Sequence, residues 1–185
     1  MQSEEPDEQE AKQENNRQRV KNPAVRIREM TIDDLADVFH LGERLFSARH
    51  SPNTYRSWDE YEVADLFYSD TEFCLVAEHE GRLIGFALGT IIDKARSAWK
   101  YGYLLWLGVV PEYQRLGIAE RLFHRFKSVM LAEDVRILVV DTEADNQSAI
   151  QFFQQEGFGN AREHIYLTMN LDSERQRFKK KANGA

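Results

Sequence analysis

Apolar residues recur along the chain with two periods, which together predict alternating strands and helices. Short runs rich in β-branched and aromatic residues predict strands over 25–30, 73–78, 83–92, 101–110, 137–141 and 164–171. Apolar residues three or four positions apart predict helices over 31–46, 57–67, 117–132 and 146–156. This order predicts one α/β domain with a mixed sheet.

Capping signals support several of the predicted boundaries. Thr31 and Ser57 each precede a carboxylate by three residues, a capping-box pattern that marks the starts of the first two helices. Gly157 follows the last predicted helix as a typical terminating glycine. The run at 137–141 is short and continuously apolar, which predicts a central strand.

Two polar segments flank the predicted domain, which spans residues 23–171. Residues 1–22 hold almost no bulky apolar side chain, so burial cannot offset the entropy of ordering, and we expect a disordered tail. Residues 172–185 include three consecutive lysines and form a basic tail. We interpret this tail as a solvated terminus rather than a nucleic-acid-binding segment.

Composition narrows the class of protein. The net charge is −7, and residues 24–171 alone carry 23 acidic and 15 basic side chains. This acidic body disfavours nucleic acid as a partner and favours a cationic substrate. Cys74 is the only cysteine, which excludes an intramolecular disulfide. The apolar runs are far shorter than the roughly 18 residues of a membrane span. We therefore predict a cytoplasmic protein with no membrane partner.

The segment from Val109 to Ala119 carries the first chemical signal. A predicted strand ends at Pro111, and Gln114-Arg115-Leu116-Gly117-Ile118-Ala119 opens the long helix. The N–H groups at a helix start lack intrahelical partners and lie at the positive end of its dipole, so this turn can hold a pyrophosphate. Gly117 would let a phosphate approach the backbone without meeting a Cβ atom.

A second block follows the next strand and reads Asn146-x-x-Ala149-x-x-Phe152-Phe153-x-x-x-Gly157-Phe158. In this order and separation, the two blocks resemble the motifs of the GNAT superfamily of acetyltransferases, over about residues 24–171. Within this superfamily, the sequence resembles the RimI-like branch. The resemblance implies a GNAT fold, with a mixed, mostly antiparallel central sheet flanked by helices and splayed at its central parallel strand pair. It also implies acetyl-CoA as cosubstrate.

The resemblance also implies which residues bind acetyl-CoA. The backbone of one strand would pair with the pantetheine arm, the loop amides would hold the pyrophosphate, and two residues of the second block would contact the cosubstrate. These implied cosubstrate-binding residues are Leu107, Gly108, Val109, Gln114, Arg115, Leu116, Gly117, Ile118, Ala119, Asn146 and Phe153. Asn146 also suits a plain helix N-cap, and both roles can hold at once.

The expected reaction is direct attack of a neutral amine on the thioester, with the Val109 N–H stabilising the oxyanion. Asp141 matches a carboxylate base of alanine N-terminal acetyltransferases in this family, although a strand-end carboxylate can also serve only as a cap. The family often has a tyrosine acid where this chain has Phe153. Tyr166 and Tyr103 are therefore candidate proton donors, and packing is the alternative for each. A thiolate can also leave unaided, since a thiol pKa is about 8.5.

The acceptor amine stays open at this point. At pH 7 an α-amine costs roughly 1 kcal/mol to deprotonate and a lysine roughly 4.6 kcal/mol, so an α-amine suits a site without a certain strong base. This favours a protein or peptide N-terminus over a small amine or polyamine. A non-catalytic CoA-binding regulatory module is a third hypothesis, motivated by Phe153. Segments 47–57 and 93–100 would build the acceptor groove.

Other sites and assemblies are not indicated. The five histidines are scattered without paired ligand spacing, so no metal site is predicted. The sequence leaves the oligomeric state open between monomer and homodimer.

Overall fold

The computed structural model describes residues 23–46, 58–92 and 99–163, together with residues 165, 167 and 171. The chain forms two compact units, Met1–Glu143 and Ala144–Ala185, and each is described by itself. Both predicted tails, Tyr166 and most of the strand predicted over 164–171 lie outside the described residues.

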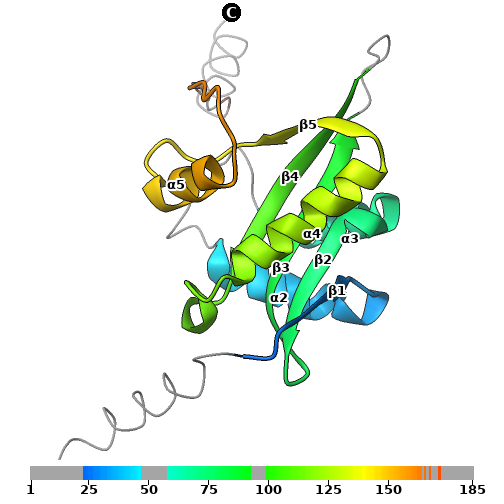
Figure 1. The fold of residues 1–185 in the computed structure, drawn as a ribbon. Helices are drawn as coiled ribbons and strands as arrows, with labels where there is room; N and C mark the ends of the chain where they lie inside the picture. Colours follow the sequence, from blue (N-terminus) through cyan, green and yellow to red (C-terminus); the bar gives the residue numbers. More distant parts are fainter. Residues whose placement is uncertain are drawn as a thin grey trace, which may run out of the picture. The chain divides into compact units, whose positions relative to one another are not determined.

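The first unit contains a five-stranded sheet in the order β1-β2-β3-β4-β5 (Figure 1). The strands are β1 (Arg26–Glu29), β2 (Cys74–His79), β3 (Arg82–Ile92), β4 (Lys100–Val109) and β5 (Val135–Val140). All neighbours are antiparallel except β4 and β5, which are parallel. The mixed, mostly antiparallel sheet of the sequence prediction is thus confirmed. Within the described residues β5 is an edge strand, and a central position for it stays a prediction.

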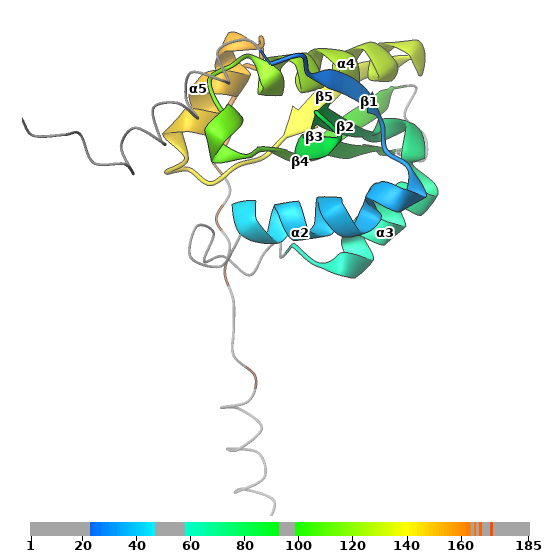
Figure 2. The ribbon, with the colours of Figure 1, turned by 90° about the horizontal axis from the view of Figure 1, so that it is seen from below.

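Helices cover both faces of this sheet (Figure 2). The helix α4 (Ile118–Ala132) packs on one face, and α2 (Leu35–Leu45) with α3 (Glu60–Ser69) packs on the other. Three short 3-10 helices join these elements: η1 (Ile32–Asp34), η2 (Thr71–Phe73) and η3 (Pro111–Tyr113). No helix in the described part of the chain combines the length and the apolar character that crossing a bilayer requires.

The two predicted capping boxes have different outcomes. At the first, the backbone N–H of Thr31 donates to the Asp34 carboxylate at 2.8 Å, as expected. At the second, the N-cap is Asp59 rather than Ser57, because its carboxylate accepts from the Glu62 N–H at 2.9 Å and so begins α3 two residues later. Ser57 itself lies outside the described residues.

An aromatic cluster fills the core between the sheet and the helices α2 and α3. Trp58 stacks on Phe86 at 5.2 Å between ring centroids, and Phe46 lies 4.8 Å from Trp106. Cys74 is fully buried in the same core. Burial and, less strongly, nearby acidic residues raise the pKa of its thiol to about 12, so Cys74 is an inert packing residue as predicted.

The second unit contains α5 (Gln147–Gln155). Asn146 caps this helix, since its side chain accepts from the Ala149 N–H at 3.1 Å. Gly157 follows the helix with φ +96°, the left-handed conformation of a terminating glycine. Phe153 is buried and lies 5.4 Å from Phe158 between ring centroids. The predicted helix boundaries are confirmed to within one residue.

Candidate active site at the end of the parallel strand pair

A β-bulge on β4 changes which helix layer its side chains face. Leu88 pairs with Trp106 while Gly89 pairs with Leu104, so Leu105 is an extra residue on β4. A Cβ on Gly102 would meet Met130 of α4, whereas one on Gly108 would meet Leu45 of α2. Residues six apart normally share a face of a strand. The bulge therefore turns the last part of β4 over, towards α2.

Pairing between β4 and β5 ends just where this bulge begins. The last pair of the parallel ladder is Leu104 with Val140, yet β4 continues to Val109 alongside β3. Val110 donates its N–H to the Ile84 carbonyl at 2.9 Å. Since antiparallel peptide groups alternate in direction, those of Leu107 and Val109 point away from β3, towards the edge that β5 no longer covers. An extended ligand can pair with such an edge.

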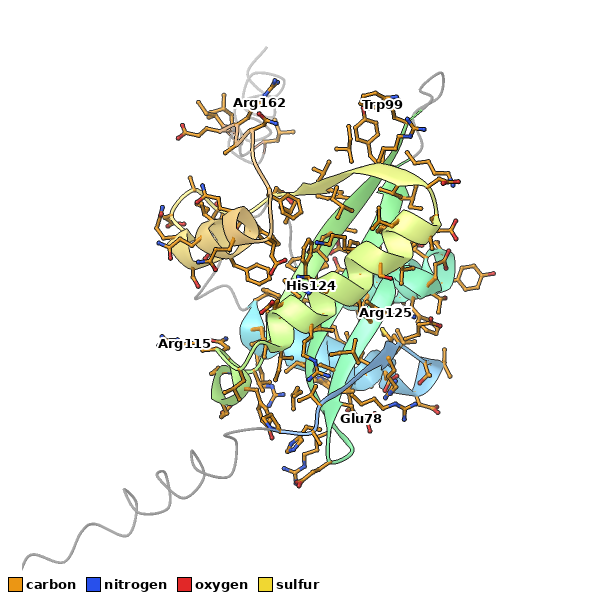
Figure 3. The ribbon with its side chains drawn as sticks, viewed as in Figure 1. Glu78, Trp99, Arg115, His124, Arg125 and Arg162 are labelled. Atoms are coloured by element: carbon orange, nitrogen blue, oxygen red, sulfur yellow. The ribbon has the colours of Figure 1, made fainter. Side chains whose placement is uncertain are left out.

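The loop between β4 and α4 is held in a defined conformation. Gln114 donates its side-chain amide to the Val109 carbonyl at 2.9 Å. Arg115 and Gly117 have left-handed backbones, with φ of +61° and +74°. When left-handed residues alternate with helical or turn residues, successive N–H groups point towards one side of the loop. They then line a concavity that can bind an anion. The Arg115 side chain extends outwards from this loop (Figure 3).

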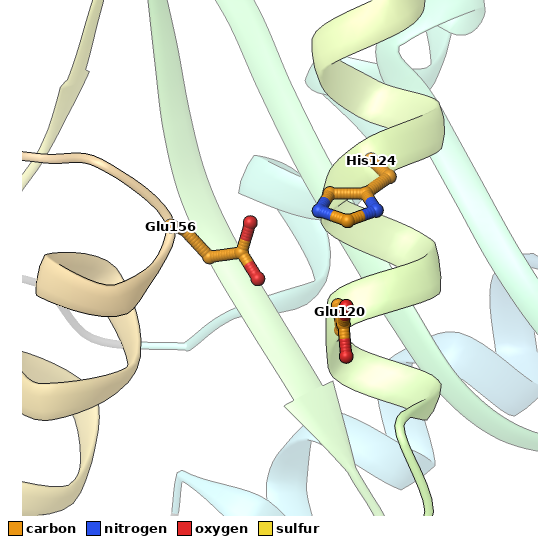
Figure 4. A group of neighbouring side chains, drawn as sticks. All are labelled: Glu120, His124 and Glu156. Atoms are coloured by element: carbon orange, nitrogen blue, oxygen red, sulfur yellow. The ribbon is translucent and has the colours of Figure 1, made fainter.

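Helix α4 begins at this loop without a side-chain cap on its first N–H groups. Its N-cap is Gly117, which has no side chain to accept from them, so they remain available to an anion. Ile118 is buried and fixes the helix start, while Leu116 is 37% exposed. Glu120 lies in the first turn with His124 one turn further along α4 (Figure 4).

Asp141 and Tyr103 meet at the carboxyl end of the parallel pair. The Tyr103 hydroxyl donates to Asp141 Oδ1 at 2.7 Å. Tyr103 lies on β4 two residues before the bulge, and Asp141 directly follows β5. The pair therefore places a carboxylate and a phenol beside the start of the uncovered edge of β4.

The structure thus gathers most of the sequence-predicted site residues in the first unit. Asp141 and the segments 107–109 and 114–119 lie around the carboxyl ends of β4 and β5. The contact between Tyr103 and Asp141, which sequence spacing did not reveal, joins residues 38 positions apart. Roles for Asn146 and Phe153 in the second unit stay predictions from the family motif. Tyr166, segment 47–57 and segment 93–98 lie outside the described residues.

Comparisons with known proteins show the family of this chain. Residues 36–158 match the model of the acetyltransferase (GNAT) family. N-alpha-acetyltransferase 30 of Schizosaccharomyces pombe is 32% identical over 124 residues, which cover 67% of this chain and 77% of that protein. The chain belongs to the GNAT family of acetyltransferases, and it is an enzyme of the acyltransferase class.

Solved structures share the fold at lower identity. Ard1 from Thermoplasma volcanium superposes with a TM-score of 0.62 at 21% identity, covering 75% of this chain and 85% of that one. The aminoglycoside N-acetyltransferase AAC(6')-Iy, in complex with a CoA-containing bisubstrate analogue, superposes with a TM-score of 0.63 at 19% identity, covering 79% and 98%. At these identities the likeness concerns the fold alone.

Proposed function

We propose that this enzyme transfers an acetyl group from acetyl-CoA to the α-amine of a protein or peptide N-terminus, in the cytoplasm. The observation that carries the proposal is the Tyr103–Asp141 pair beside the uncovered edge of β4. The name of the Schizosaccharomyces pombe relative, an N-alpha-acetyltransferase, supports the α-amine as the acceptor.

The residues of the first unit fit acetyl-CoA in two places. The outward N–H and carbonyl groups of Leu107 suit an amide of a pantetheine arm, because they lie along an edge without a strand partner from β5. The concavity formed by Arg115 and Gly117, with the start of α4, suits a pyrophosphate. Bound there, acetyl-CoA would supply a thioester as the activated acyl donor.

Groups of the chain itself can act on the acceptor amine and on the thioester carbonyl. The Val109 carbonyl is engaged by Gln114, which leaves the Val109 N–H to donate to the thioester oxygen as negative charge develops. Asp141 would accept the proton that the attacking amine loses, directly or through a water molecule. The Tyr103 hydroxyl orients this carboxylate by donating to its Oδ1 atom. The acetyl C–S bond breaks, and the departing sulfur leaves as a thiolate.

The free energy of deprotonation favours an α-amine over a lysine here. At pH 7 the difference in cost is roughly 3.6 kcal/mol. At the carboxyl ends of β4 and β5, Asp141 is a hydrogen-bonded carboxylate, and such a base is suited to an amine that is already partly neutral. A small amine remains an outcome of the test rather than a second proposal.

The test is release of CoA thiol from acetyl-CoA with two panels: peptides with varied N-termini, and free amines including polyamines and amino acids. We expect turnover on peptides with a free α-amine and none once that amine is blocked. Turnover on small amines alone would move the function to metabolite acetylation. Binding of acetyl-CoA without turnover on either panel would support a regulatory module.

Replacing the proposed base gives a sharper prediction. Asp141→Asn should lower kcat on the order of 10²-fold, the usual contribution of a general base, and leave the Kd for acetyl-CoA within about twofold. The asparagine can still accept from Tyr103, so the local contact survives. Glu143→Gln, two residues further along the same loop, is the control with unchanged kcat. An unaltered pH–rate profile in Asp141→Asn would remove Asp141 as the base.

Filling the proposed phosphate concavity should abolish binding. Gly117→Trp adds an indole beside the first N–H groups of α4, so we expect calorimetry to detect no binding of acetyl-CoA. Gly117→Ala is the matched control: it carries the same left-handed backbone strain of about 1 kcal/mol with little added volume. It should therefore lose stability but keep most of its affinity. Unchanged affinity in Gly117→Trp would place the phosphates elsewhere.

A further inference from the structure

The loop that precedes α4 is held from two sides. On one side, Gln114 bonds to the Val109 carbonyl at the end of β4. On the other, the Tyr113 hydroxyl lies 3.0 Å from Nδ1 of His79, at the end of β2. The two rings also pack against each other, with centroids 5.5 Å apart at 60°. Tyr113 is the last residue of η3 and directly precedes the segment 114–119.

His79 is a firm point of attachment for this loop. It ends β2, whose first four residues are buried, and it pairs with Arg82 across a two-residue turn. Tyr113 is tied to its own strand as well, because its N–H donates to the Val110 carbonyl at 2.9 Å. The contact therefore joins two elements through residues that are 34 positions apart in the chain.

We infer that His79 is a positioning residue for acetyl-CoA binding, acting through Tyr113 on the loop 114–119. The inference rests on the proposed binding of acetyl-CoA at this loop. Two anchors hold η3 before the ligand arrives, so the N–H groups of the following concavity are already oriented. If one anchor is lost, the loop must be ordered when acetyl-CoA binds, and the entropic cost of this ordering weakens the binding.

The chemistry of the pair makes the anchor tolerant of protonation. With a neutral imidazole that carries its proton on Nε2, the Tyr113 hydroxyl donates to Nδ1. With a protonated ring, Nδ1–H donates and the hydroxyl oxygen accepts. The pair keeps one hydrogen bond in both states, so a pH profile is not informative. The informative measurements are the Kd for acetyl-CoA in each single variant and in the double variant.

The experiment measures the Kd for acetyl-CoA by calorimetry and kcat at saturating acetyl-CoA on an accepted substrate. Tyr113→Phe removes only the hydroxyl, and His79→Ala removes its partner. Each should raise the Kd about fivefold, the effect of one hydrogen bond, with kcat within about twofold. In the double variant the Kd should also rise about fivefold rather than about 25-fold, because both changes break the same contact. His79→Gln, which keeps an acceptor, should restore part of the affinity.

Tyr61→Phe, an exposed tyrosine on α3, is the matched control and should leave the Kd unchanged. Wild-type protein that does not bind acetyl-CoA would overturn the proposed function and this inference together. Wild-type binding with an unchanged Kd in Tyr113→Phe and His79→Ala would overturn the positioning role alone. Multiplicative losses in the double variant, or losses confined to kcat, would also contradict it.

Discussion

Left-handed backbone at non-glycine residues marks two places around the candidate site. Arg115 adopts φ +61° inside the loop proposed to bind phosphate, and Glu80 adopts φ +50° in the turn that carries His79. Such conformations cost roughly 1 kcal/mol or more for a residue with a Cβ atom. At Arg115 the strain accompanies a concavity of N–H groups. The backbone strain at Glu80 does not accompany such a concavity, so a substitution can relieve it.

Glu80→Asn should stabilise the protein. Glu80 and Gly81 both have positive φ, the conformation of a two-residue hairpin turn that favours Asn-Gly. We expect the free energy of unfolding in urea to rise by about 0.5–1 kcal/mol. Glu72→Asn, at an exposed residue whose φ is negative, should produce no such gain. A destabilised Glu80→Asn would mean that the Glu80 side chain has a role of its own.

At the scale of secondary-structure elements, one close approach joins α2 to the segment before α3. A Cβ on Gly42 would overlap the indole of Trp58. That indole cannot move aside easily, because its Nε1–H donates to the Phe39 carbonyl at 2.9 Å and its ring stacks on Phe86. The same aromatic cluster includes Trp106 of β4, just beyond the bulge. Gly42 thus sets how closely α2 can approach the strand that carries the site.

Gly42→Ala should destabilise the protein although alanine is the better helix former. Helix propensity favours alanine by about 1 kcal/mol, whereas overpacking a core costs typically 1–3 kcal/mol and the Trp58 hydrogen bond adds about 1 kcal/mol. We expect a net loss of roughly 2 kcal/mol in urea unfolding. The control is the same change in a Trp58→Ala background, where it should be neutral or stabilising. An equal loss of unfolding free energy in that background would mean that the contact with Trp58 is not the cause.

At the scale of the whole molecule, an ionic network joins segments that are far apart in the chain. Arg28 of β1 donates to both oxygens of Asp34, at 2.6 and 2.8 Å, and to Glu78 of β2 at 2.9 Å. The Arg28 guanidinium and the N–H and hydroxyl of Thr31 lower the pKa of the buried Asp34 carboxyl to about 2. The ionised carboxylate therefore stabilises the folded state.

This network predicts an acid-sensitive stability. The folded pKa of Asp34 is about 2, below its unfolded value of about 3.9, so its contribution is complete above about pH 4 and is lost as the pH falls towards 2. The contribution is roughly 2 kcal/mol. Asp34→Asn should lose about this much in urea unfolding at pH 7, with a smaller difference from the wild type at pH 3. A constant difference between these pH values would contradict the assignment.

Much of the fold could be predicted because local patterns decide it. Period-two and helical apolar patterns predicted all five strands of the first unit and its three α-helices, with boundaries within four residues. The N-cap of α3 at Asp59 was missed, because Asp59 and Ser57 are both good capping residues and the local pattern does not distinguish them. The motif residues of the loop and of α5 were likewise visible, since glycine and capping signals are local.

The sequence by itself determined the family, the order of elements and the residues of the loop proposed to bind phosphate, because each rests on a short pattern of adjacent side chains. Tertiary structure alone decided the bulge at Leu105, the end of pairing at Leu104 and the contacts Tyr103–Asp141 and His79–Tyr113. The bulge depends on the register between β3 and β4, and the other three features depend on residues more than 30 positions apart, which packing of the whole sheet brings together. No local pattern of side chains specifies such distances.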